Sequence, residues 1–333
     1  MKTIAFLVVL FTVPAMNAQE TATAFAPTLE STIVEDQNLI YCTTTELLWR
    51  ELIEYMGGIP KFILPNENTM ALRKSMNDYS DRISEDHWLA IVGETEDGII
   101  DSITREMNRK FKNAALLDLP NENDIIGYSY LEKNVKFSAY LTRDVGAINF
   151  KGTLVKAFGL EGGFPNKYNE RVKIHDYQNK DDFILQLECK DSLDQIYLAK
   201  ISPGATLSET YEKAISRVEK DSIRYLKKYD MLKIPFLQFD ITENFIDSLP
   251  FVIEETTTDY HFVDLTQRIK FDLNEEGIKL HSNAAAIIDF GEFEPATFYT
   301  FDQPFLVIMK RKGRQEPYFV YWVANAEHMK TWR

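Results

Sequence analysis

The hydrophobic pattern of this chain changes its period near Asp124, and this change limits the folds open to it. Before Asp124, apolar residues recur at helical spacing, as at Leu48, Leu52 and Met56. After Asp124, runs of β-branched and aromatic residues alternate with a period of two and are separated by Gly, Pro, Asn and Asp. Helices first and strands later predict an α+β fold dominated by a large sheet.

The same pattern predicts the individual elements. The part before residue 110 is expected to be mainly helical, with helices over 44–56, 69–82 and 97–112. Strands are expected at 125–141, 150–160, 182–188, 195–201, 234–241, 268–273, 305–310 and 318–324. A further helix is expected within 203–229, capped by Thr206 or Ser208. No repeat of 20 to 50 residues is visible, which disfavours a solenoid or a propeller.

The N-terminus has the pattern of a secretory signal peptide. Lys2 precedes an apolar stretch over 4–13, and Ala15 and Ala18 supply the small residues of a cleavage site after Ala18. The apolar stretch is too short for a transmembrane segment, although a retained anchor is the alternative. We therefore expect a secreted or periplasmic protein, with residues 19–333 as a single domain.

Charge and cysteine content narrow the function classes. The chain has 51 acidic and 37 basic residues, a formal charge of -14, which argues against nucleic acid or an anionic membrane as the main partner. Cys42 and Cys189 are too few for a disulfide framework. They either pair with each other in an oxidising compartment or are ordinary core residues.

Motifs for enzymatic chemistry are missing from the sequence. The histidines show no metal-ligand spacing; they are His87, His175, His261, His281 and His328. No Gly-x-Ser-x-Gly elbow, Walker loop or dinucleotide-binding glycine pattern occurs. A cysteine nucleophile would need a histidine brought close by the fold. We expect no enzyme, no metal and no cofactor.

Several blocks resemble the serpin family in order and spacing. From Glu96 onwards, "EDGIIDSITREMNRKF" looks like the helix that lies across the central sheet, and "NDIIGYSYLEKNVKFSAYL" is similar to the long central strand. They are followed by "AINFKGTLVKAFGL", "LECKDSLDQIYLAKISPGATLSETYEKAI", "LKIPFLQFDITENFIDSL", "RIKFDLNEEG" and "FDQPFLVIMKRKGRQEPYFVYWVANA". The resemblance implies a serpin-like domain with an abbreviated helical region over 19–95 and a sheet-rich core over 96–333.

The resemblance also implies a reactive-centre loop. Gly277 of the Glu275-Glu276-Gly277 landmark and Pro304 are 27 positions apart, close to the span of that loop in serpins. In the family the loop is protease bait, and after cleavage it enters the central sheet as a new strand. Alternation then implies that Ile278, Leu280, Ser282 and Ala284 face inward.

The hinge and the scissile region follow from the same resemblance. The hinge comprises Glu275, Glu276, Gly277, Ile278, Leu280, Ala284, Ala285 and Ala286. Counting from Gly277 places the scissile bond after Gly291, and counting back from Pro304 places it after Phe293, so the scissile region is Phe290, Gly291, Glu292 and Phe293. No Lys or Arg lies between Leu280 and Pro304, so the target protease is not trypsin-like. A chymotrypsin-like, elastase-like or papain-like protease fits better.

Three departures from the family keep a second function open. Ile278 and Leu280 are larger than the small residues that inhibitory serpins favour at the hinge, and Gln267 stands where the family usually has a sheet histidine. The Asn...Ser-Pro-Ser-Ile segment of the family's shutter is also missing. The leading hypothesis is a monomeric, secreted protease inhibitor, and the alternative is a non-inhibitory serpin-fold binding or structural protein. A ligand pocket lined by Phe236, Phe239 and Tyr299 is a third hypothesis.

Overall fold

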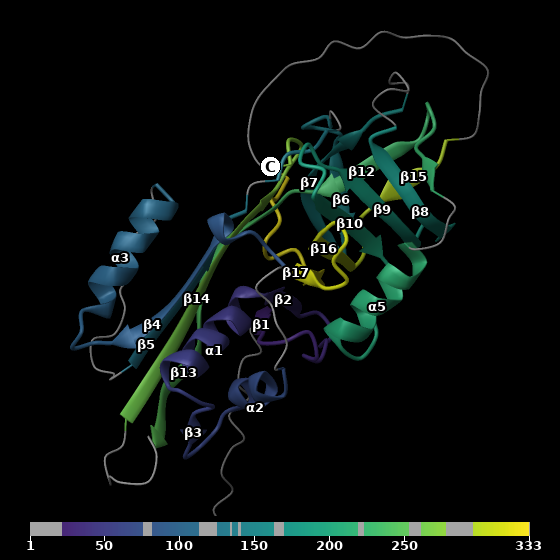
Figure 1. Cartoon of the computed structure of the whole chain (residues 1–333). Helices are drawn as coiled ribbons and strands as arrows, with labels where there is room; N and C mark the ends of the chain where they lie inside the picture. Colours follow the sequence, from purple (N-terminus) through teal and green to yellow (C-terminus); the bar gives the residue numbers. More distant parts are fainter. Residues whose placement is uncertain are drawn as a thin grey trace, which may run out of the picture.

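The computed structural model describes most of the chain in three β-sheets with helices against them (Figure 1). The described residues are 22–75, 82–112, 125–133, 135–138, 141–162, 170–218, 223–252, 261–277 and 296–332. Among them, no helix is both long enough and apolar enough to cross a membrane.

The five-stranded sheet contains the longest strands. Its order is β3 (Lys61–Phe62), β13 (Leu237–Val252), β14 (His261–Leu273), β5 (Ile125–Leu131) and β4 (Trp88–Glu94). Neighbouring strands are antiparallel except β14 and β5, which run parallel from Val263↔Ile125 to Ile269↔Leu131. We call this parallel junction the seam.

Two helices cover opposite faces of this sheet. Helix α1 (Thr44–Tyr55) buries Leu48, Trp49 and Leu52 against one face, together with Ile125 and Leu265. Helix α3 (Ile99–Lys110) packs on the other face over β4 and β5, where Ile103 and its neighbours contact an apolar cluster. Burial of each apolar stripe holds the helix in place.

Helix α2 (Glu67–Lys74) lies beside the outer strand β13. Asn66 caps this helix, because its side-chain oxygen accepts from Thr69 N at 2.8 Å. The side-chain amides of Asn66 and Asn68 donate to Phe245 O on β13, at 3.2 Å and 3.0 Å. The start of α2 is thus fastened to the rim of the five-stranded sheet.

The eight-stranded sheet forms the opposite half of the molecule. Its order is β1 (Thr23–Ala26), β2 (Asn38–Cys42), β17 (Pro317–Val323), β16 (Phe305–Arg311), β10 (Asp194–Lys200), β9 (Asp182–Glu188), β8 (Val172–Asn179) and β11 (Arg224–Tyr225). Helix α5 (Leu207–Val218) packs on one face through Leu207, Tyr211 and Ala214. The other face of the sheet contributes to the central core.

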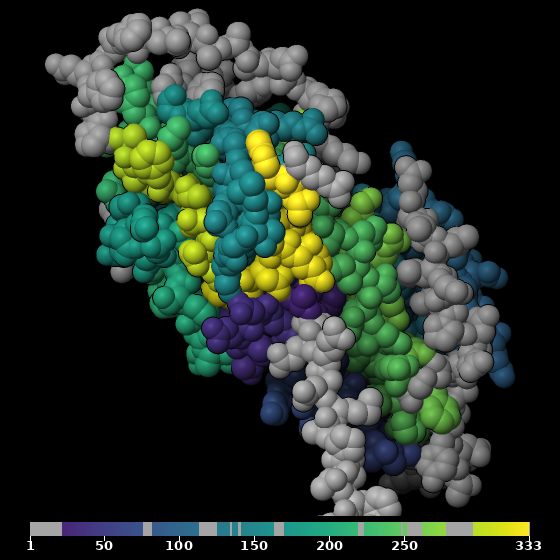
Figure 2. All heavy atoms as spheres, turned by 180° about the vertical axis from the view of Figure 1, so that it is seen from behind, coloured from purple at the N-terminus to yellow at the C-terminus, as the bar shows by residue number. Residues whose placement is uncertain are grey.

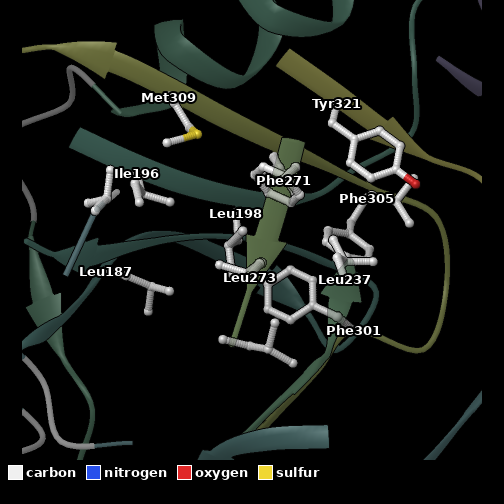
Figure 3. Packing of buried hydrophobic residues seen from close by; sticks show 14 of the residues in the cluster. Leu187, Ile196, Leu198, Leu237, Phe271, Leu273, Phe301, Phe305, Met309 and Tyr321 are labelled. Carbon is white, nitrogen blue, oxygen red and sulfur yellow. The ribbon is translucent and has the colours of Figure 1, made fainter. Parts of the chain in front are cut away.

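The four-stranded sheet closes the central core. Its order is β15 (Phe298–Thr300), β12 (Met231–Pro235), β7 (Thr153–Leu160) and β6 (Ala147–Phe150), with β15 parallel to β12. All three sheets contribute to one buried cluster, in which Phe271 and Leu273 at the end of β14 face the strands that carry Leu198 and Phe305 (Figure 3).

The C-terminal segment joins two of the sheets. Met329 bridges Leu237 of the five-stranded sheet, and Thr331 bridges Val155 of the four-stranded sheet. From behind, the C-terminal residues (yellow) lie between teal strands and the green β13 and β14 hairpin (Figure 2). This segment therefore fixes the relative position of the two sheets.

Several sequence predictions need correction. The three N-terminal helices form, although α2 ends at Lys74 and does not extend to residue 82. The strands β1 to β4 and the short 3-10 helix Glu85–His87 lie in the same region, so the mainly helical prediction is incomplete. The strand expected over 125–141 ends at Leu131. Helix α5 ends at Val218, and Arg224 and Tyr225 form β11 instead of continuing it, because they pair with β8.

Candidate functional site

The seam is the feature of the five-stranded sheet that could admit another strand. Two parallel neighbours can each pair antiparallel with one strand that runs the opposite way between them. The ladder between β14 and β5 ends at Ile269↔Leu131, whereas β14 itself continues to Leu273. The end of the seam nearest Gly277 is therefore already free of β5 pairing.

Tight packing holds the seam closed along its length. A Cβ atom placed on Gly127 of β5 would lie 2.2 Å from Leu265 Cδ2 on β14 and 3.2 Å from Leu48 Cδ1 on α1. Glycine at this position lets Leu265 pack directly across the seam. A side chain there would force the two strands apart or displace Leu265.

A buried polar contact crosses from the seam to helix α1. Gln267 on β14 is 2% exposed, and its Nε2 donates to Thr44 Oγ1, the first residue of α1, at 2.5 Å. Ser129 is the register partner of Gln267 on β5 and is fully buried. Gln267 thus occupies the place where the serpin resemblance expects a histidine, and Thr44 supplies its partner. Sequence patterns did not predict this contact, because nothing in them indicates which strand Thr44 meets.

The segment Glu275-Glu276-Gly277 belongs to a tight turn at the end of β14. Gly277 has φ +92°, and its N donates to Asn274 O at 3.2 Å. Phe137 N donates to Glu276 O at 3.1 Å, so the turn is fastened to the segment that follows β5. A Cβ atom on Gly277 would lie 2.3 Å from Val135 O. Both the conformation and the space require glycine here.

Charged side chains surround this turn. Glu275 Oε1 lies 3.6 Å from Arg143 Nε. Lys133, just after β5, pairs with Asp194 at the start of β10 at 3.0 Å; the Asp194 side chain is buried and that of Lys133 is 9% exposed. These two ion pairs connect the end of the seam near Gly277 to residues outside the five-stranded sheet.

The chain beyond the loop enters the same core. Phe301 and Phe305 are fully buried, and Figure 3 shows both near Leu273, which lies four residues before Gly277. Thr297 N donates to Asp230 Oδ1 at 2.9 Å, which fixes the chain just before β15. The chain on either side of the segment 278–295 therefore packs into the same buried core.

The predicted site residues divide into two groups. Glu275, Glu276 and Gly277 lie together in the turn. The remaining residues of the predicted hinge and scissile region lie outside the described residues, namely Ile278, Leu280, Ala284, Ala285, Ala286, Phe290, Gly291, Glu292 and Phe293.

Other candidate residues have structural positions. Cys42 and Cys189 are free and buried; burial raises the pKa of Cys42 to about 11 and that of Cys189 to about 12, so neither thiol is primed as a nucleophile. Phe236, Phe239 and Tyr299 are part of the packed central core, which argues against a ligand pocket between them. Within the described ranges, no group of His, Cys, Asp and Glu is placed to hold a metal ion.

Comparisons with known proteins identify the fold. No protein-family model and no curated protein matches the sequence. Human glycosylated kallistatin is similar in structure, with a TM-score of 0.54 and 11% identity over 87% of this chain and 92% of that chain. A serpin from the trematode Schistosoma haematobium gives 0.53 and 12% over 87% and 94%, and human thyroxine-binding globulin gives 0.52 and 9% over 87% and 92%.

These likenesses show the fold. The chain is a divergent serpin-fold protein of the α+β class, as the sequence blocks predicted. In the five-stranded sheet, β14 is the central strand and β5 is its parallel neighbour.

Proposed function

We propose that this protein is a secreted or periplasmic protease inhibitor that presents residues 278–295 as bait. After cleavage, the part of the loop that follows Gly277 enters the seam as a new strand. The observation that carries the proposal is the parallel seam directly beside the turn at Gly277. The proposal assigns the protein no catalytic activity of its own.

The direction of the chain supports insertion. β14 runs toward Gly277, and the turn reverses the chain there. A segment that continues back from the turn is therefore antiparallel to β14 and to β5 alike. It would complete two antiparallel ladders in place of one parallel ladder, which stabilises the cleaved form.

The loop sequence is compatible with a strand between the two helical layers. The proposed inward positions Ile278, Leu280, Ser282 and Ala284 carry no charge, whereas Lys279 and His281 fall on the other face. Phe290 or Phe293 beside the scissile bond favours a chymotrypsin-like or elastase-like protease over a trypsin-like one.

The test is to incubate the protein with such a protease. An inhibitor forms a covalent complex that survives SDS, and the cleaved protein gains a large increase in melting temperature because a strand has joined the sheet. Ala284→Arg should abolish both results by placing a charge at an inward position. The matched control Asn283→Arg, on the outward face, should retain them. Cleavage with no rise in melting temperature would overturn the proposal.

A non-inhibitory binding protein is the alternative. Human thyroxine-binding globulin, solved with its ligand, shows that the same fold also occurs in a binding protein. The large residues Ile278 and Leu280 next to Gly277 favour this alternative, since they slow entry into a packed sheet. Under this alternative the loop is cut as an ordinary substrate, and the melting temperature stays unchanged.

A further inference from the structure

A small polar cavity lies where the five-stranded sheet meets the helices α1 and α2. Its volume is about 20 Å³, which is enough for one occupant of the size of a water molecule. The lining includes Phe25 of β1, Thr45 of α1, Asn68 of α2, Glu243 and Phe245 of β13, and Gln267 of β14. Five separate elements therefore contribute side chains to one small space.

The backbone of β13 departs from regular pairing beside this cavity. Glu243 and Gln267 are register partners, so their side chains lie next to each other on the face of the sheet that carries α1. Phe245 is an extra residue between the paired positions Asn244 and Ile246, which makes a β-bulge. A bulge changes the direction of its side chain. Phe245 is 5% exposed and closes one side of the cavity.

The polar atoms left over in the lining are mainly hydrogen-bond acceptors. The side-chain amide of Asn68 donates to a carbonyl oxygen of β13 at 3.0 Å, and that of Gln267 donates to Thr44 Oγ1 at 2.5 Å. Each amide therefore retains its own carbonyl oxygen as an acceptor. Among the residues that the structure describes, no donor is bound to either amide oxygen or to the carboxylate of Glu243, and the Thr45 hydroxyl has no partner there either.

Glu243 supplies the only charge in this lining. No cationic side chain among the described residues pairs with its carboxylate. Burial raises the pKa of Glu243, and no neighbouring charge contributes to the shift. Thr45 and Gln267 are 3% and 2% exposed, so bulk water has little access to their oxygens. A positively charged occupant would therefore stabilise this lining better than a neutral water molecule.

Size and charge restrict the kind of cation. Divalent cations are usually bound by more than one carboxylate, whereas this lining has a single one. The other ligands would be neutral amide and hydroxyl oxygens, which suit hard cations. One carboxylate balances one positive charge. The volume of about 20 Å³ leaves no room for an organic cation such as choline.

We propose that the cavity binds one small monovalent cation through oxygen atoms of Glu243, Gln267, Asn68 and Thr45. Na⁺, K⁺ and NH₄⁺ share the required chemistry, namely a single charge and a preference for oxygen ligands. The bound cation would contact α1, α2, β13 and β14 together, and it would stabilise the attachment of these two strands to the helices. The inference does not depend on the proposed function, because it concerns the uncleaved protein alone.

The experiment measures the melting temperature of the uncleaved protein at neutral pH in four chloride salts. The salts contain Na⁺, K⁺, NH₄⁺ or choline at equal ionic strength, and choline serves as a cation that is too large for the cavity. A ligand that binds only the folded chain stabilises it. We expect the parent to melt about 2 °C or more higher in at least one small-cation salt than in choline chloride, with saturation as the concentration rises. The salt with the largest effect identifies the preferred ion.

Glu243→Gln removes the charge of the site and keeps the shape of the side chain. E243Q should melt at the same temperature in all four salts. It should not be less stable than the parent in choline chloride, because the carboxylate has no cationic partner there. The matched control is D247N, which removes an exposed carboxylate of the same strand outside the lining and should keep the response of the parent.

A second pair of variants tests a neutral ligand. Thr45→Val removes the hydroxyl oxygen from the lining and should raise the salt concentration that gives half of the effect by about threefold or more. Thr43 is fully buried in the same segment but does not line the cavity, so T43V should leave this concentration unchanged. Equal responses in T45V and T43V would exclude Thr45 as a ligand.

Hydrogen exchange locates the effect in the molecule. In the preferred salt, amide exchange over 243–246 and 265–267 should be slower than in choline chloride for the parent and unchanged for E243Q. Equal melting temperatures of the parent in all four salts would show that the cavity holds only water. A response of E243Q as large as that of the parent would show that the ions act elsewhere. Either result overturns the inference, and neither measurement involves a protease, so the inhibitory function is tested separately.

Discussion

Gln267 on β14 and Thr44 at the start of α1 are joined by a buried hydrogen bond of 2.5 Å, although 223 positions separate them in the chain. Thr44 Oγ1 also lies 3.0 Å from Cys42 Sγ. The contact fastens one strand of the seam to the helix beneath it, so it opposes any movement that separates β14 from β5.

Removal of one partner of this hydrogen bond should be costly. Gln267→Leu or Thr44→Val leaves the other polar group buried without its partner, at a cost of about 1–3 kcal/mol in the free energy of unfolding. The double variant should lose less than the sum of the two, and Thr44→Ser should stay near the parent. Urea unfolding of the parent and the four variants measures these losses; strictly additive losses would show that the two groups are not coupled.

Gly277→Ala should destabilise the protein more than Gly313→Ala. Both glycines have positive φ, +92° and +80°, so each alanine carries backbone strain of about 1–3 kcal/mol. Only at Gly277 does the new Cβ also meet a backbone oxygen, that of Val135 at 2.3 Å, whereas Gly313 has open space around it. Thermal unfolding of the two variants tests this prediction. Equal losses of stability would mean that the backbone around Gly277 shifts at little cost to accommodate the new Cβ.

Stability should fall as the pH decreases below about 6.5. Burial between Phe239 and Tyr321 lowers the pKa of His328 and outweighs the opposing effect of Glu327. Below its ordinary pKa the histidine takes up a proton in the unfolded chain but not in the folded one, so protons favour unfolding until the folded pKa is reached.

His328→Gln should therefore flatten the dependence of unfolding free energy on pH between about 7 and 5. Part of the slope should remain, because burial also lowers the pKa values of His87 and His175. Urea titrations at several pH values give the slope. A slope as steep as that of the parent would show that His328 is not one of the groups responsible.

The two cysteines should be unreactive in the folded protein. Their buried thiols have pKa values raised to about 11 and about 12. At pH 8 a thiol-specific reagent such as DTNB should modify neither Cys42 nor Cys189, whereas both should react once the chain is unfolded in guanidinium. Rapid modification of the folded protein would contradict the buried positions of the two thiols, and two unreactive thiols after unfolding would indicate a disulfide.

Residues with strong local patterns allowed correct predictions. The strand over 182–188 forms with these bounds because its apolar residues pack on both faces of a central strand, and Thr206 caps α5 as expected, accepting from Glu209 N at 3.2 Å. The strand expected over 268–273 also ends where predicted, because β14 ends at Leu273.

The missed elements lack such a local signal. β2 and β4 are short apolar runs that periodicity cannot distinguish from buried helix, and their partners lie far away in the chain. Arg224 and Tyr225 follow a helical pattern but pair with β8, so tertiary contacts override local propensity. The contact between Gln267 and Thr44 joins residues 223 positions apart, and one sequence contains no record of it.

The amides of Asn66 and Asn68, which donate to Phe245 O at the rim of β13, have a consequence for association between molecules. An exposed strand edge is a template on which another chain can add and begin aggregation. Here two side chains donate hydrogen bonds to a carbonyl oxygen that an incoming strand would otherwise pair with. In addition, β3 pairs with the edge at Phe251 and Val252. The border of the five-stranded sheet is thereby protected against the addition of a strand from a neighbouring molecule.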